Sequence, residues 1–132
     1  MKSKEILLIT SFPPRKCGIA TYSQDLIHAI EDKYEDAFRI KICALKKKDI
    51  QLEYPHSVSF LLKSWIREDY LRLANDINAN NSIQIIYLQH EFGLYDGEYG
   101  EYILDFLKAV KTPVIKHSIP SFQSLLRKGG GW

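Results

Sequence analysis

The chain has 132 residues, of which 45% are hydrophobic and 12% are aromatic, enough for one domain with its own core and too apolar for a disordered protein. The formal net charge is +2, and no basic stripe is present, so we expect no nucleic acid partner. No apolar run approaches the ~18 residues that a membrane-spanning helix needs. We therefore expect no transmembrane segment and a cytoplasmic location.

Two small groups of residues have simple interpretations. Cys17 and Cys43 form neither a metal-binding spacing nor a disulfide framework, so we expect free thiols in a reducing compartment. A cysteine nucleophile formed by Cys17 with His90 is an alternative, but no orienting residue supports it. The cationic run at 46–48 is expected to be a solvated turn after a strand.

In chain order, the hydrophobic pattern alternates between strand and helix. Four consecutive apolar residues within 5–10 predict a strand that is buried on both faces. A stripe at helical spacing over 19–30 predicts the first helix, of about three turns. Apolar and polar residues alternate over 38–44, which is typical of a half-buried strand nearer the edge of a sheet.

The second half of the chain continues the same alternation. A short strand at 58–62 precedes a helical stripe at 66–77, and an apolar strand follows at 83–88. A third helix is expected over 99–110, and a last strand begins at 113–115. Strands separated by helices predict an α/β, Rossmann-like fold with a mostly parallel sheet of about five strands, flanked by helices.

Ligands bind at the carboxyl ends of the strands in an open parallel sheet, and an unusual loop follows the first strand. Residues 11–18 read Ser-Phe-Pro-Pro-Arg-Lys-Cys-Gly and lead into the first helix, whose N-terminal amides are suited to a phosphate. Gly18 would let the backbone approach such a ligand closely. The loop matches neither a dinucleotide fingerprint nor a Walker loop, and a tight turn that requires glycine is the alternative.

A second unusual loop, residues 89–100, follows the strand at 83–88. It places His90 and Glu91 directly after a buried strand, a position that makes a ligand-binding role for His90 as good an interpretation as a hydrogen-bonded structural histidine. Acidic residues follow without the spacing of metal ligands, so we expect solvated loop acids and no metal site. These acids are Asp96, Glu98 and Glu101.

Both loops resemble motifs of a bacterial branch of glycosyltransferase family 4. The first motif is Phe-Pro-Pro-Arg-Lys-Cys-Gly-Ile-Ala-Thr-Tyr at 12–22, followed by Asp-Leu at 25–26. The second is Gln-His-Glu-Phe-Gly-Leu-Tyr-Asp-Gly-Glu-Tyr-Gly-Glu-Tyr at 89–102, followed by Leu-Asp at 104–105 and Pro-Val at 113–114. Two long motifs in the right order are more specific than either alone, and the resemblance covers roughly residues 5 to 115.

The resemblance implies one half of a GT-B fold, in which two Rossmann-like domains face each other across a cleft. Such enzymes move a sugar from a nucleotide-sugar donor to an acceptor with retention of configuration and without a metal. Gly18 would reach over the donor diphosphate, and His90 and Glu91 would line the cleft near the acceptor or the transferred sugar. No residue of this chain is assigned a catalytic role, and no cofactor is implied, since the nucleotide-sugar is a substrate.

In that family the second domain supplies most of the donor contacts, including basic residues and a pair of glutamates. We therefore expect a chain that ends before that domain to be inactive alone. The nucleotide-sugar and a sugar or glycan acceptor would be ligands of the full-length parent protein. The rival interpretation is a non-enzymatic, Rossmann-like module that binds a small ligand or a protein.

Residues 1–116 are expected to form an incomplete N-terminal domain, and 117–132 an out-of-frame or unstructured tail. Relatives continue after the last strand with Thr, Phe or Leu, His, Thr, two apolar residues and Pro. Residues 116–123 read Lys-His-Ser-Ile-Pro-Ser-Phe-Gln, and their codons permit that sequence in the neighbouring reading frame. We infer a frameshift near Lys116, so His117 is not equated with the family's histidine. A tail that merely diverged is the alternative.

Overall fold

A computed structural model describes residues 4–11, 18–34, 37–48, 53–90 and 94–117. Its helices and strands alternate along the chain much as the hydrophobic pattern predicts. They are β1 (Glu5–Thr10), α1 (Gly18–Tyr34), β2 (Arg39–Lys46), β3 (Val58–Lys63), α2 (Arg67–Asn78), β4 (Ile83–Gln89), α3 (Tyr102–Ala109) and β5 (Val114–His117).

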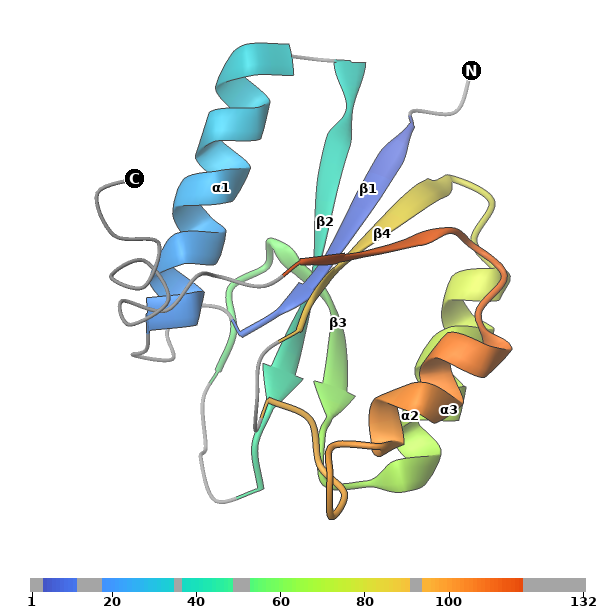
Figure 1. Cartoon of the computed structure of the whole chain (residues 1–132). Helices are drawn as coiled ribbons and strands as arrows, with labels where there is room; N and C mark the ends of the chain where they lie inside the picture. The colour runs from blue at the N-terminus through green and yellow to red at the C-terminus, as the bar shows by residue number, and fades with distance from the viewer. Residues whose placement is uncertain (1–3, 12–17, 35–36, 49–52, 91–93, 118–132) are drawn as a thin grey trace, which may run out of the picture.

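The five strands form one sheet in the order β3-β2-β1-β4-β5, and every neighbouring pair is parallel. Helix α1 lies on one face of this sheet, and α2 and α3 lie on the other (Figure 1). The predicted α/β, Rossmann-like class is therefore confirmed. The strand order reverses at β1, because β2 and β3 extend the sheet on one side and β4 and β5 on the other. In open α/β sheets, this reversal creates the crevice in which ligands bind.

The central strand β1 supplies side chains to both layers of the core. Leu7 and Ile9 pack in the larger apolar cluster, with α2 and α3, whereas Leu8 packs in the smaller cluster, with Ile27 of α1. Burying an aliphatic side chain of this size stabilises the fold by roughly 1.5–3 kcal/mol. The run of apolar residues in β1 thus forms a strand that is buried on both faces, as the sequence predicts.

Strand β2 differs from the predicted half-buried strand. Four consecutive residues, Ile42, Cys43, Ala44 and Leu45, are buried. Ile42 and Ala44 contact the smaller cluster, and Cys43 and Leu45 contact the larger one. The reason is position: β2 lies between β1 and β3, so β3 forms the edge and β2 has a core layer on each face.

Helix α3 is shorter than its predicted stripe. It begins at Tyr102, because the backbone before it contains Gly97 and Gly100 with φ values of +111° and +76°, which interrupt a right-handed helix. It ends before Val110, whose backbone is extended. At the carboxyl end of the chain, β5 includes His117, the first residue of the predicted tail, and residues 118–132 lie outside the described residues.

Candidate functional site

The two motif loops follow neighbouring strands. β1 and β4 are parallel, with Ile9 paired to Leu88, so both strands end at the same rim of the sheet. His90 comes directly after β4 and is exposed, and Gly18 is the first residue of α1, the helix that follows β1. Glu91 lies outside the described residues, as do residues 12–17 of the first loop. The candidate site is therefore this rim, and of the two side chains predicted to bind a ligand there, His90 is the one that the structure describes.

The hydroxyl groups of Thr10 and Ser23 connect the end of β1 to α1. They lie 2.7 Å apart and are both buried, so they share a hydrogen bond away from water. A buried hydrogen bond of this kind adds about 0.5–1.5 kcal/mol to stability. It also fixes the first turns of α1 relative to the strand end, which determines where the amino end of that helix lies.

Tyr95 closes the second loop onto the end of β4. Its ring is buried, and its hydroxyl donates a hydrogen bond of 2.5 Å to the backbone carbonyl of Gln89. Burial raises the pKa of Tyr95 well above its usual value, so the hydroxyl remains a neutral donor. The ring centroids of His90 and Tyr95 are 6.2 Å apart with the planes tilted by 34°. Tyr95 therefore forms one wall beside the imidazole of His90.

The expectation that the cationic run at 46–48 is a solvated turn is wrong for Lys47, which is bound to the loop after β4. Its ammonium group donates to the backbone carbonyl of Leu94 at 2.7 Å and lies 3.3 Å from an Asp96 carboxylate oxygen. Its side chain is only 21% exposed. Because the partners are 47 and 49 residues further along the chain, local sequence pattern does not reveal this contact. Lys47 joins the end of β2 to the loop after β4.

The carboxylate of Glu101 organises the turn before α3. It accepts hydrogen bonds from the backbone amides of Tyr99 at 2.8 Å and Glu98 at 3.1 Å. These bonds, with that of Tyr99 the largest effect, hold the pKa of Glu101 below its ordinary value. Within the described ranges, no three side chains of His, Cys, Asp or Glu gather closely enough to hold a metal ion. The carboxylate of Glu101 thus stabilises the backbone of the loop and is not part of a metal site among the described residues.

The cysteine interpretation receives no support from Cys43. This thiol is buried, and burial raises its pKa far above the ordinary value, which suppresses the thiolate needed for nucleophilic attack. Cys17, the residue of the notional Cys-His pair, lies outside the described residues.

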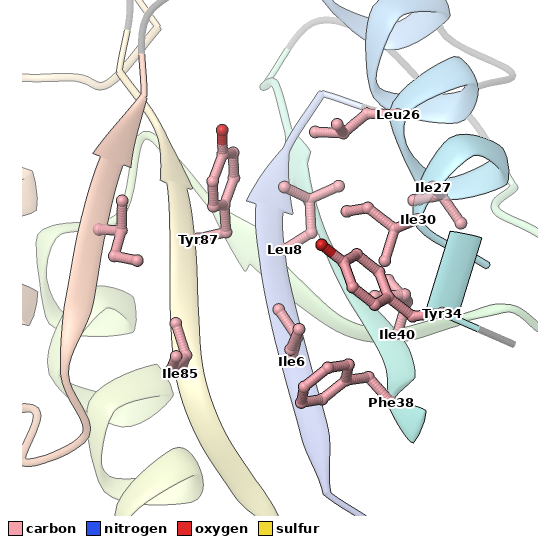
Figure 2. A pocket seen from close by; sticks show the side chains of 11 residues that line it. Ile6, Leu8, Leu26, Ile27, Ile30, Tyr34, Phe38, Ile40, Ile85 and Tyr87 are labelled. Atoms are coloured by element: carbon pink, nitrogen blue, oxygen red, sulfur yellow. The ribbon is translucent and has the colours of Figure 1, made fainter. Parts of the chain in front are cut away.

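A separate hollow lies on the α1 face of the sheet, away from the rim. It has a volume of about 270 Å³. Figure 2 shows α1 side chains facing those of β1, with Ile85 and Tyr87 of β4 on the far side. The lining comes from α1, the residue before β2, and strands β1, β2, β4 and β5. It consists of Ile6, Leu8, Leu26, Ile27, Ile30, Tyr34, Phe38, Ile40, Ile85, Tyr87 and Ile115.

Comparisons with known proteins add no family to this geometry. The chain matches no protein-family model, and no curated protein matches it. Among the described residues, no helix combines the length and the hydrophobicity required to cross a membrane. The basis for a functional assignment is therefore the fold, the two motifs and the rim at which β1 and β4 end.

Proposed function

We propose that this chain is the N-terminal, acceptor-side domain of a retaining glycosyltransferase, which moves a sugar from a nucleotide-sugar to an acceptor hydroxyl. The proposal is carried by one observation. The two segments that resemble family 4 motifs follow β1 and β4, neighbouring parallel strands that end at one rim where the strand order reverses. This is the part of an open α/β sheet where ligands bind.

The residues at the rim suit a positioning role. The amino end of α1, beginning at Gly18, would present backbone amides and a partial positive charge to the departing diphosphate. His90 would contact the acceptor or the transferred sugar from the end of β4. Catalysis would then come from holding the donor's anomeric carbon against the acceptor hydroxyl and from stabilising the leaving group. A second domain must supply the other wall of the cleft.

The nucleotide sequence across Lys116 provides the first test. The neighbouring reading frame should continue into a second Rossmann-like domain. Joining the two frames at this point should give a longer protein, which we call the joined protein. We expect that protein to release a nucleoside diphosphate from at least one of UDP-glucose, UDP-galactose or GDP-mannose in the presence of a glycan acceptor. A stop codon at once in the neighbouring frame, or no turnover of any donor, would contradict the proposal.

Substitution of His90 tests its place in the site. In the joined protein, His90→Ala should lower kcat/KM by about tenfold or more, because a side chain at the centre of a binding cleft contributes directly to the bound state. The matched control is His56→Ala, which removes an exposed histidine that precedes β3. Equal kinetic effects of the two substitutions would remove His90 from the site.

A further inference from the structure

Tyr99 is unusually exposed for a large hydrophobic residue. Its exposed fraction is 88%, whereas the other exposed large hydrophobic residues among those described range from 41% to 50%. Single apolar side chains on a surface are common, so exposure alone identifies no site.

The loop that carries Tyr99 is held at several points. Leu94 and Tyr95 at its start are buried, and the ammonium of Lys47 holds the carbonyl of Leu94. At its tip, the carboxylate of Glu101 holds the backbone amide of Tyr99 itself. A rigid loop loses little conformational entropy when a ligand binds. Tyr99 is thus an aromatic ring presented to solvent on an ordered backbone.

The loop also lies at the functional rim. It follows β4, and Figure 1 shows residues 94–101 beyond the carboxyl ends of β2 and β3. The contact of Lys47 with Leu94 and Asp96 fixes it at the end of β2. His90 follows β4 on the same rim. A ligand bound at the carboxyl ends of β1 and β4 that extends along the rim toward β2 and β3 would therefore pass this loop.

The charge of the loop selects the ligand class. Within 94–101 the charged side chains are all acidic: Asp96, Glu98 and Glu101. Lys47 pairs with Asp96, and Arg67, whose charge reaches Glu101, is itself paired with Asp105, so the carboxylates of Glu98 and Glu101 keep the charge beside Tyr99 predominantly negative. Phosphates and other anions are disfavoured there by repulsion. A neutral sugar suits this surface, because its C–H face packs on an aromatic ring and its hydroxyls donate to carboxylates.

We propose that Tyr99 is a stacking platform for a neutral pyranose ring of the acceptor glycan. This inference rests on the proposed glycosyltransferase function, since that function makes the ligand at the rim a sugar. Tyr99 binds the acceptor at a distance from the reacting atoms. Its contribution is to the affinity and orientation of the glycan.

The test uses the chain itself and requires neither donor nor turnover. Saturation-transfer NMR with methyl glucoside, methyl mannoside and methyl galactoside should show transfer to the ring C–H protons of at least one glycoside. Tyr99→Ala should weaken that binding by about tenfold, which corresponds to about 1.4 kcal/mol. Tyr99→Phe, which keeps the ring face, should stay within about threefold of the original affinity. Glucose 6-phosphate should bind more weakly than methyl glucoside.

The matched control is Tyr34→Ala, which removes an exposed tyrosine at the end of α1 and should leave sugar binding unchanged. Because Tyr99 is almost fully exposed, Tyr99→Ala should keep the fold, which amide NMR spectra check directly. The platform is refuted if no glycoside receives saturation or if Tyr99→Ala and Tyr34→Ala behave alike. If the joined protein transfers sugar but Tyr99→Ala does not change glycoside binding, the glycosyltransferase proposal is supported and the role of Tyr99 is refuted. If glycosides bind through Tyr99 but the joined protein transfers no sugar, the sugar-binding role of Tyr99 is supported and the glycosyltransferase proposal is contradicted.

Discussion

At the scale of single residues, burial determines whether Cys43 can react. The thiol is fully buried in β2, and burial raises its pKa well above the ordinary value. In a Cys17→Ser variant at about pH 8, we expect Ellman's reagent to label Cys43 on the order of 100-fold more slowly in the folded protein than in urea. Equal labelling rates in the two conditions would show that the β2 core opens freely.

The position of His90 at the end of β4 shows what local pattern reveals at this scale. His90 stands out because a polar residue directly follows a buried strand, and that position is visible in the sequence. Lys47 and Tyr95 do not stand out, because their roles depend on tertiary contacts that periodicity does not encode. Lys47 reaches a carbonyl 47 residues away, and the hydroxyl of Tyr95 turns back onto Gln89.

At the scale of elements, Arg72 of α2 ties that helix to the edge strand. Its guanidinium donates to the backbone carbonyl of Leu61 at 2.7 Å and to the carboxylates of Asp69 and Asp76. Asp69 in turn accepts a hydrogen bond from the backbone amide of Lys63 at 2.8 Å. Asp69 and Arg72 thus connect β3, an edge strand, to the helix that follows it.

This connection should depend on pH through Asp69. Partial burial alone would raise the pKa of this carboxyl, but hydrogen bonds from Arg72 and from the amide of Lys63 outweigh burial and lower the pKa. A carboxyl with a lowered pKa stabilises the fold at pH values above its unfolded pKa of about 4, and that stabilisation disappears as the pH falls through the folded pKa.

Urea unfolding of the original chain and of Asp69→Asn measures the effect. Asp69→Asn should be less stable near pH 6, and the difference should shrink as the pH falls through the lowered pKa of the folded carboxyl, where the original side chain also becomes protonated. Asp76→Asn breaks an exposed pair with the same arginine and is the matched control, with a smaller loss expected near pH 6. A stability difference for Asp69→Asn that does not change with pH would contradict this account.

The elements themselves were largely predictable, but their ends were not. All five strands and all three helices appear in the hydrophobic pattern, because burial in a parallel sheet and amphipathic spacing are both encoded locally. The helix starts lack the usual capping signals: Ile66 precedes α2, Glu101 precedes α3, and neither forms a side-chain cap. The hydrophobic stripe therefore predicts a start of α3 at Tyr99, whereas the helix begins at Tyr102.

At the scale of the whole molecule, the two faces of the sheet are packed unequally. Tyr70, Leu73 and Ile77 of α2 are fully buried, together with Phe106 of α3, on one face. On the other face α1 covers only part of the sheet, and Ile115 of β5 is 50% exposed beside the apolar hollow. The difference follows from topology, because α2 and α3 serve the crossovers toward β4 and β5, whereas α1 alone serves the crossover toward β2.

The unequal packing leads to a prediction for the free chain. An apolar fluorescent dye such as ANS should bind the native protein at the α1 face, because such dyes respond to exposed apolar surface. Ile115→Gln should reduce the fluorescence, since Ile115 lines the hollow. Leu104→Gln is the matched control, because Leu104 is similarly exposed, at 46%, but lies on α3 at the opposite face. Equal fluorescence losses in both variants would mean that the dye does not distinguish the two faces, and the hollow would then not be the dominant apolar surface of the native chain.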